Sequence, residues 1–302
     1  IRGNKMLLVT GITGHSGGYF LQELIKNKYE GPIRCVVRQT SDTNELDKSG
    51  LSIEKAVGDL HDQAFLDKSL AGVKTVLHIA GIGETPFVID AAIKNNVERA
   101  ILVHTTGIYS KYKSASELYK KIEKEVDEKI PNQPDPKIQI TILRPTMIYG
   151  DIRDHNISKF IKMVDRLRIF PVINRGTGLI QPVNARDLGR AYYQVLMNNN
   201  TGGKSYVLSG NNVVTMLEMF KRISSTLGKQ TYFLSVPVAL GVFMARILKL
   251  GTMNRIDFVE KVQRMAEDRC YPNDSARKDF DYNPMEFFDG LDREVIEYMG
   301  SL

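Results

Sequence analysis

The chain has 302 residues, 42% of them hydrophobic, which is long enough for one large domain or two lobes that share a core. This composition argues against global disorder. The 41 lysine and arginine residues exceed the 35 aspartate and glutamate residues and give a net charge of +6. The basic residues are scattered, and no zinc knuckle, arginine-rich arm or aromatic RNA-binding signature occurs. We therefore expect a small-molecule partner and no nucleic acid. The positive net charge of the chain suits an anionic molecule.

The first half of the chain alternates short β-branched runs with helical patterns. Alternation of this kind predicts right-handed crossovers and a parallel sheet covered on both faces, a doubly wound Rossmann architecture with its ligand at the carboxyl ends of the strands. The expected strands are 6–10, 33–38, 52–57, 75–79, 100–105 and 138–144, and the expected helices are 18–27, 63–70, 87–96 and 114–129.

After residue 150 the regular alternation of strand and helix patterns gives way to longer helical patterns. These predict a smaller, mostly helical C-terminal substrate lobe. The helices are expected at 156–167, 184–197, 215–227 and 286–299. A lone strand pattern at 204–209 follows a Gly-Gly turn and is a candidate edge strand of the first sheet. The expected division is therefore 1–150 for the dinucleotide-binding domain, rejoined by about 184–210, with 151–183 and 211–302 in the substrate lobe.

The longest apolar stretch, residues 236–250, is interrupted by Pro237 and two basic residues and is too short to span a bilayer. It predicts an amphipathic helix in a core or over a pocket, with a membrane-surface role as the alternative. Cys35 and Cys270 lie in unrelated segments and cannot form the disulfide framework of a small secreted domain. We expect a cytoplasmic location, no transmembrane segment and no metal site.

A glycine-rich turn connects the first strand to the first helix. Glycine permits the tight turn and the close approach of a pyrophosphate, and the helix N-terminus offers N–H groups and a positive dipole end. Its position after the first strand predicts dinucleotide binding, although glycines also mark ordinary turns. The residues expected to contact the phosphates are Gly11, Thr13, Gly14, His15, Ser16 and Gly17.

The glycine spacing is three and three, and five further short motifs follow strand ends in a fixed order. They are Gly58-Asp59-Leu60, His78-Ile79-Ala80-Gly81, Thr105-Thr106-Gly107-Ile108-Tyr109, the run 143–150 and the run 181–188. Together they cover nearly the whole chain. This set resembles the extended and atypical branches of the short-chain dehydrogenase/reductase superfamily, often called NAD-dependent epimerase/dehydratase-like.

The resemblance implies roles for residues at four strand ends. Asp59 and Leu60 should flank the adenine, although an aspartate there is often only a helix cap. The stretch Ile79, Ala80 and Gly81 should line the ribose and phosphates. The residues expected beside the nicotinamide are Thr105, Pro145 and Thr146.

The residue that ends the second strand predicts the cofactor preference. An acid at this place would bind the ribose 2′-hydroxyl, but the chain has Arg38, whose guanidinium can clamp a 2′-phosphate. Thr40 and Ser41 can add hydroxyl donors. NADP is therefore favoured over NAD, and the alternative is an arginine stacked on the adenine of either cofactor.

The catalytic pattern of the family is incomplete. Most catalytic members use a Ser or Thr after the fifth strand and a Tyr followed four residues later by Lys, which lowers the pKa of the phenol. Thr105 matches the hydroxyl, with Thr106 as the alternative. Tyr109 and Lys113 have the dyad spacing but lie close to the strand.

The expected helix offers no complete dyad in any register. Tyr119 is well placed but is followed four residues later by Glu123. If Lys121 and Glu125 take the places of the lysine and the glutamate of the family's helix, Glu117 stands at the tyrosine position. Tyr119 is the first candidate proton donor, with Tyr109 and Lys113 next.

Two function classes remain open. One is an NAD(P)-dependent oxidoreductase or epimerase acting on a carbonyl, a sugar nucleotide or a related alcohol. The other is a non-catalytic NAD(P)-binding sensor or assembly protein. The sequence is compatible with a homodimer. Candidate pocket or rim residues between the lobes are Tyr149, Arg153, Arg175 and Gln181.

Overall fold

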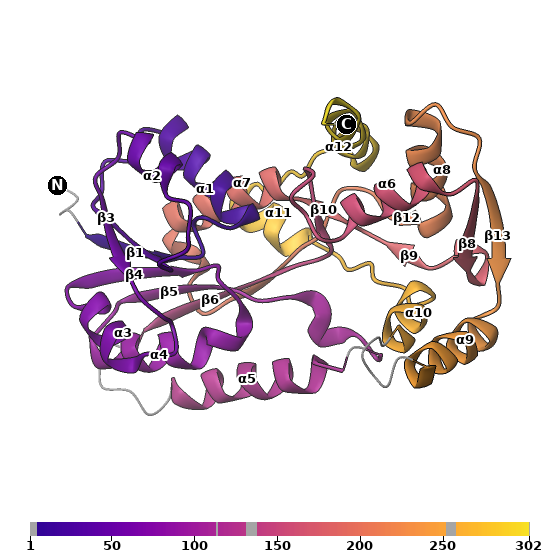
Figure 1. Ribbon diagram of the computed structural model, residues 1–302. Coiled ribbons are helices and arrows are strands. Elements are labelled where there is room, and N and C mark those ends of the chain that lie inside the picture. The colour runs from indigo at the N-terminus through magenta and orange to yellow at the C-terminus, as the bar shows by residue number, and fades with distance from the viewer. Residues whose placement is uncertain (1–4, 113, 131–137, 252–257, 302) are drawn as a thin grey trace.

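The computed structural model describes residues 5–112, 114–130, 138–251 and 258–301. Its main element is a seven-stranded parallel sheet with the strand order β11-β6-β5-β4-β1-β2-β3 (Figure 1). The bounds are β1 Met6–Thr10, β2 Ile33–Val37, β3 Ile53–Val57, β4 Val73–His78, β5 Arg99–Val103, β6 Gln139–Pro145 and β11 Ser205–Leu208. All seven strands therefore point their carboxyl ends to the same edge, where a doubly wound fold binds its ligand.

Helices cover both faces of this sheet. One face packs against α1 (His15–Lys26), α7 (Ala185–Met197) and α11 (Asp274–Phe280). The other face packs against α3 (Gln63–Leu70), α4 (Thr85–Lys94) and α5 (Ser116–Lys129). Burial on both sides explains why the central strands are continuous apolar runs instead of alternating patterns. A short helix α2 (Asn44–Lys48) lies between β2 and β3.

The second lobe has its own core, built mainly from α6 (Ile157–Arg166), α8 (Met216–Thr226) and α12 (Phe287–Gly300). Three small strand pairs add to it: β7 (Ile148–Tyr149) with β10 (Val183–Asn184), β9 (Leu179–Ile180) with β12 (Val214–Thr215), and β8 (Ile169–Ile173) with β13 (Tyr232–Val236). Helices α9 (Val238–Gly251) and α10 (Val259–Met265) follow β13 at the end of the molecule away from the large sheet (Figure 1). The doubly wound sheet with a smaller, mostly helical lobe is confirmed.

The strand expected at 204–209 is β11, the edge strand of the large sheet. Helix α11 also lies on this sheet through Ala276 and Phe280, although it belongs to the 211–302 segment expected in the substrate lobe. The boundary between the lobes remains a prediction. The first helix begins at His15, three residues before the expected Gly18, because the chain enters helical geometry directly after Gly14.

The prediction of a core helix for residues 236–250 is wrong. In α9 only Gly241 and Ala245 are buried, and no residue of this helix lines either of the two cavities described below. Apolar content predicted burial, but the helix lies at the periphery of the second lobe. Among the described residues, no helix is both long and apolar enough to cross a membrane.

Candidate dinucleotide and substrate site

The turn after β1 is built from glycines that its geometry requires. Gly11 has a φ of +72°, and a Cβ at this residue would lie 2.7 Å from the Ala80 backbone nitrogen. A Cβ on Gly17 would lie 2.1 Å from the Gly11 carbonyl oxygen, so helix α1 can approach the turn only with glycine there. The Gly14 N–H closes the turn by donating to the Gly11 carbonyl at 3.0 Å. The first-turn N–H groups of α1 have no partner within the helix and are available to an anion.

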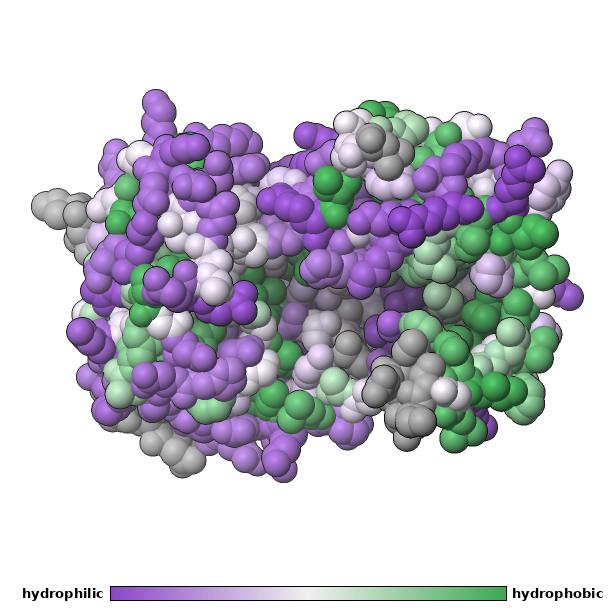
Figure 2. Space-filling view, viewed as in Figure 1, coloured by the Kyte–Doolittle hydropathy of each residue, from purple (hydrophilic) through white to green (hydrophobic). Residues whose placement is uncertain are grey.

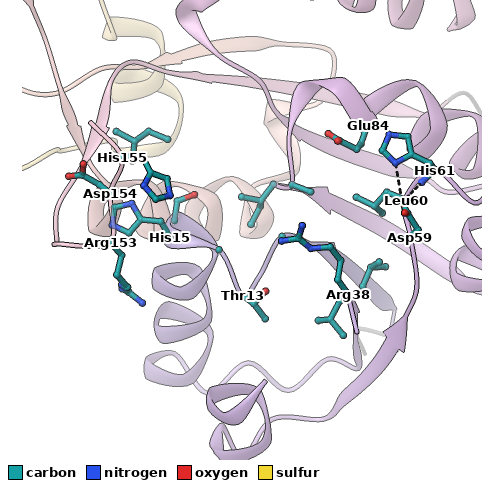
Figure 3. Close-up of a pocket in the computed structure, with 18 of the residues that line it drawn as sticks. Thr13, His15, Arg38, Asp59, Leu60, His61, Glu84, Arg153, Asp154 and His155 are labelled. Carbon is teal, nitrogen blue, oxygen red and sulfur yellow. Dashed lines mark hydrogen bonds and ion pairs between the residues drawn. The ribbon is translucent and has the colours of Figure 1, made fainter. Parts of the chain in front are cut away.

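A cavity of about 780 Å³ opens at this turn, where β1, β2, β3 and β4 end (Figure 3). The loop 153–156, which follows β7, forms part of its wall. A cavity of this volume is in the range of cofactor sites. Of the residues expected to bind the dinucleotide, those lining the cavity are Gly11, Thr13, Gly14, His15, Ser16, Arg38, Asp59, Leu60, Ile79 and Ala80.

The other expected residues lie behind the cavity or farther along the same edge. Gly17 packs against the turn, and Gly81 and Pro145 do not line either cavity. Thr105 and Thr146 line a second cavity instead. Five polar lining residues of the first cavity were missed by the sequence reasoning: His61, Glu84, Asp154, His155 and Asn156. Three of them belong to the polar run directly after the 143–150 motif, a signal that could have flagged this loop.

Charged groups of both signs meet at the β2 and β3 end of the cavity. Arg38 lines the cavity and is exposed (Figure 3), and its backbone N–H donates to Ser41 Oγ at 3.1 Å. Asp59 accepts hydrogen bonds from the backbone N–H and the ring of His61, and these bonds, helped by Arg38, lower the pKa of the exposed Asp59 carboxyl. Arg38 therefore brings a positive charge to the wall of this cavity.

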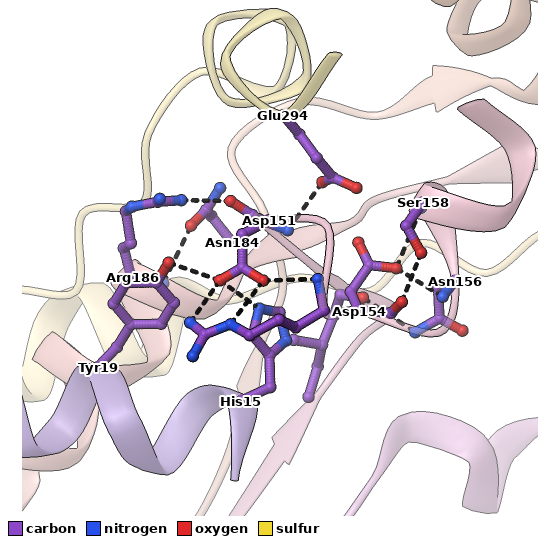
Figure 4. A network of polar contacts seen from close by, with 12 residues as sticks. His15, Tyr19, Asp151, Asp154, Asn156, Ser158, Asn184, Arg186 and Glu294 are labelled. Atoms are coloured by element: carbon purple, nitrogen blue, oxygen red, sulfur yellow. Dashed lines mark hydrogen bonds and ion pairs between the residues drawn. The ribbon is translucent and has the colours of Figure 1, made fainter. Parts of the chain in front are cut away.

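The loop after Gly150 is attached to the start of α1 by a buried aspartate (Figure 4). Asp151 accepts hydrogen bonds from Tyr19 Oη at 2.7 Å and from Arg153 Nη2 at 2.7 Å, and His15 Nε2 lies 3.2 Å away. Burial alone would raise the pKa of the Asp151 carboxyl, but these partners hold it well below its usual range. Asp151 therefore remains charged and fixes one wall of the cavity against the start of α1.

A second buried acid connects this loop to the C-terminal helix α12. Glu294 is fully buried and accepts a hydrogen bond from the Gly150 N–H at 3.0 Å (Figure 4). Burial, and next the neighbouring Asp154, raise the pKa of Glu294 to about 10. Glu294 is therefore protonated at neutral pH beside Asp154, a lining residue of the cavity.

A second cavity, of about 290 Å³, adjoins the first, since Ile148 and Asn156 line both. Its other polar lining residues are Thr105, Thr106, Ser110, Thr146, Gln181, Arg264, Arg269 and Tyr271. Among the described residues, its wall therefore contains two arginines and no carboxylate. Burial, and next the nearby Arg264, lower the pKa of Arg269 to about 10, so the Arg269 guanidinium remains cationic at neutral pH.

The two arginines and Tyr271 come from sequence that carried no recognised signal. They lie more than 100 residues beyond the last strand of the first half and reach the site only because α10 and the following segment fold back over it. Gln181 of the expected rim lines this second cavity and Arg153 lines the first, whereas Tyr149 is buried and Arg175 lines neither.

Helix α5 is anchored by its buried Glu123. Its carboxylate is 2.9 Å from His104 Nδ1 and accepts hydrogen bonds from Arg144 Nε at 2.9 Å and Nη2 at 2.6 Å. His104 Nε2 lies 3.2 Å from Thr85 Oγ1. If Glu123 takes the place of the family's helix glutamate, the lysine position is occupied by Tyr119 and the tyrosine position by Ala115.

The candidate proton donors lie at different distances from the cavities. Tyr119 is half-buried on α5, and Tyr109 is 47% exposed, with its ring centroid 5.3 Å from that of Tyr271. Neither lines the second cavity, whereas Tyr271 does. Lys113 lies outside the described residues. The hydroxyls of Thr105 and Thr106 both line the cavity; Thr105 accepts from the Gly107 N–H, and Thr106 donates to the Pro145 carbonyl.

Comparison with known proteins agrees with this geometry. The model of the NAD(P)H-binding family matches residues 11–161, half of the chain, and the chain belongs to this family. The match begins at the glycine turn and includes the loop that carries Asp154. The chain is thus an NAD(P)-binding protein of the Rossmann type.

Solved structures with a similar fold span nearly the whole chain. The UDP-glucose 4-epimerase from Thermotoga maritima has a TM-score of 0.74 at 15% identity and covers 98% of this chain and 99% of its own. The dTDP-glucose 4,6-dehydratase DesIV from Streptomyces venezuelae has a TM-score of 0.73 at 19% identity, covering 98% and 97%. The triphenylmethane reductase from Citrobacter sp. has a TM-score of 0.73 at 19% identity, covering 96% and 99%. The expected resemblance to epimerase/dehydratase-like Rossmann proteins is confirmed at the level of the fold.

One curated relative is similar over a shorter stretch. Sterol demethylase protein B from Methylococcus capsulatus is 38% identical over 73 residues, which is 24% of this chain and 21% of the relative. The match spans about a fifth of that protein, so it supports local similarity only.

Proposed function

We propose that this protein is an NADP-dependent oxidoreductase or epimerase that acts on a carbonyl or alcohol group of an anionic substrate. The observation that carries this proposal is the pair of adjoining cavities. The first has the glycine turn and helix N-terminus of a dinucleotide site, and the second has hydroxyl groups and two arginines. Their shared wall at Ile148 and Asn156 is where a reacting carbon would meet the nicotinamide.

The residues present fit a dinucleotide, because a Cβ on Gly11 or Gly17 would fill the space in which the turn approaches the neighbouring backbone. We assign the pyrophosphate to the turn and the start of α1, and the adenine to Asp59 and Leu60. The ribose and phosphate wall would be Ile79, Ala80 and Gly81, and the nicotinamide would lie by Thr105, Pro145 and Thr146. The bound cofactor supplies or accepts a hydride.

Arg38 supports the phosphorylated cofactor. It follows β2, lines the cavity and is exposed, and no carboxylate takes its place at the end of this strand. A guanidinium there can form charge-assisted hydrogen bonds to a 2′-phosphate, whereas NAD offers it only a hydroxyl. NAD remains the alternative cofactor if Arg38 stacks on the adenine.

Unsatisfied arginine donors support an anionic substrate. The Nε groups of Arg264 and Arg269 are buried and have no hydrogen-bond partner among the described residues. A buried N–H without a partner is costly, so an acceptor from a ligand would be strongly favoured there. A sugar nucleotide has such acceptors in its diphosphate, and the structure of the similar Thermotoga maritima epimerase was determined with UDP-glucose.

Tyr271 is an additional candidate for the proton donor. Burial, and next the nearby Glu267, raise the pKa of its phenol above the ordinary value of 10. A phenol with a raised pKa stays protonated at neutral pH, so it can donate a proton but is a poor base. Reduction should therefore be faster than oxidation. Tyr119, Tyr109 and Lys113 remain the candidates that the sequence predicts.

The second candidate function is a dinucleotide sensor without hydride transfer. The register of α5 favours this function. If the buried Glu123 takes the place of the family's helix glutamate, Tyr119 and Ala115 occupy the positions of the family's lysine and tyrosine. Such a helix cannot lower the pKa of a catalytic phenol in the way that the family's lysine does.

A turnover assay separates the two functions. Oxidation of NADPH would be followed with a panel of carbonyl compounds and sugar nucleotides, next to a direct NADPH titration. We expect Tyr271→Phe to lower the rate by ~100-fold while leaving NADPH affinity nearly unchanged. Tyr232→Phe is the matched control, because Tyr232 is 70% exposed and lines neither cavity. If Tyr119→Phe is the damaging change instead, the donor is on α5. Tight NADPH binding without turnover on any substrate contradicts the enzyme and supports the sensor.

A further inference from the structure

Helix α9 packs against the protein with its smallest residues. A Cβ on Gly241 would lie 2.9 Å from both Ile173 Cδ1 of β8 and Val262 Cγ1 of α10, and Ala245, one turn later, is also buried. In a helix that stabilises a core, the large apolar side chains point inward. In α9 this arrangement is reversed, because its inward face consists of glycine and alanine.

The large apolar residues of α9 point outward instead. Leu240, Phe243, Met244 and Ile247 follow the i, i+3, i+4, i+7 spacing of one helix face, and their exposed fractions are 48%, 60%, 58% and 53%. Leu250 continues this stripe and is 76% exposed. Such a stripe is unfavourable in contact with water, because removing apolar side chains from water stabilises them.

The strand pair before α9 extends the same surface. Tyr232 of β13 pairs with Ile169 of β8, and Leu234 pairs with Pro171. The outward side chains Tyr232, Ile169 and Leu234 are 70%, 61% and 60% exposed. Figure 2 shows hydrophobic side chains gathered over this end of the molecule, from the β8–β13 pair to α9. We call the surface formed by the α9 stripe and these strand residues the apolar face.

The two chain segments that build the apolar face carry charged side chains of one sign only. Residues 166–186, which include β8, contain no aspartate or glutamate, and residues 219–256, which include β13 and α9, contain none either. The first segment contains four arginines, and the second contains three lysines and three arginines. Arg246, which flanks the α9 stripe, is exposed, as are Arg168 and Arg175 near β8.

We propose that the apolar face binds the surface of a bilayer that contains anionic lipids. An outward apolar stripe in a segment that carries cations and no carboxylate is the pattern of an interfacial helix, which inserts its apolar side chains and pairs its cations with anionic headgroups. A second copy of the chain would bring the same positive charges against each other, so charge favours the lipid surface over self-association. This proposal is independent of the reaction proposed above.

Vesicle sedimentation of the full chain tests the proposal. The protein would be mixed with vesicles of phosphatidylcholine alone and with vesicles of equal parts phosphatidylcholine and phosphatidylglycerol. We expect binding to the anionic vesicles, falling by about tenfold or more in the double variant Phe243→Gln with Ile247→Gln. Ile296→Gln is the matched control, because Ile296 is also 58% exposed but lies on α12. NADPH titration of each variant checks that the fold is intact.

A charge variant provides the second test. Arg246→Glu should weaken binding to anionic vesicles by about fivefold or more without altering the apolar stripe. Absence of wild-type binding to anionic vesicles overturns the proposal, as does equal binding to neutral vesicles. A dimer in sedimentation equilibrium that the Phe243→Gln, Ile247→Gln variant dissociates, without vesicle binding, would instead assign the apolar face to self-association.

Discussion

Replacing Glu123 by glutamine removes one charge from a buried cluster while keeping the shape of the side chain. Glu123 is 7% exposed and has three contacts, one with His104 Nδ1 and two with the Arg144 guanidinium. The amide can still accept one hydrogen bond, but it cannot compensate the Arg144 charge. The cluster joins α5 to β5 and β6, so its loss should weaken the packing of α5 on the sheet.

The pKa of Glu123 gives the magnitude. Burial alone would raise it, but His104 and Arg144 lower it from the ordinary value of 4.5 to about 2. A carboxyl whose pKa falls by this amount on folding stabilises the folded state by about 3 kcal/mol at neutral pH. Removing one partner of a buried ion pair typically costs about 3–5 kcal/mol. We therefore expect Glu123→Gln to lower the free energy of unfolding by about 3 kcal/mol.

Urea denaturation at neutral pH measures this loss. Glu117→Gln on the same helix is the control, since Glu117 is exposed and, among the described residues, pairs only with Lys120. Its loss should be below about 1 kcal/mol. Because the pKa of Glu123 is lowered in the folded state, its contribution is complete above the ordinary pKa of 4.5 and disappears as pH falls toward 2. Equal losses in the two variants, or a Glu123→Gln loss that does not shrink in acid, would refute the reasoning.

Three further predictions concern the cofactor site. Gly17→Ala should abolish the rise in melting temperature on adding NADPH, because its Cβ would lie 2.1 Å from the Gly11 carbonyl; Gly18→Ala, with no atom within 4 Å of its Cβ, should retain it. Arg38→Asp should weaken NADP binding by about 1.5–3 kcal/mol more than NAD binding in parallel calorimetric titrations, and equal losses would support adenine stacking. Glu294→Gln should flatten the pH dependence of stability between about pH 5 and 8, because burial and Asp154 raise the pKa of Glu294 to about 10 while the unfolded carboxyl ionises near 4.5. Wild-type stability should fall with rising pH by up to about 3 kcal/mol at pH 7, and a wild-type profile as flat as that of the variant would contradict the raised pKa.

Local patterns in the sequence determined the sheet and the cofactor turn. Strand 6–10 and helix 63–70 have the predicted bounds, because hydrophobic periodicity and capping residues act within one element. The glycine turn was equally readable, since a tight turn and a close backbone approach demand glycine at particular positions. Ten of the residues expected to bind the dinucleotide line the first cavity for the same reason: they follow parallel strands that end at one edge.

Only the tertiary structure decided the second cavity and the register of α5. Arg264, Arg269 and Tyr271 reach Thr105 because the chain returns across the site, and no local pattern encodes a contact over that separation. Helix periodicity placed Glu117, Tyr119 and Glu123 on one helix, but only the positions of His104 and Arg144 identify Glu123 as the buried acid. Likewise, apolar content predicted that residues 236–250 would be covered, whereas folding left their large side chains outside. Hydrophobicity determines which side chains are unfavourable in water, and the packing of distant elements determines which of them are buried within the chain.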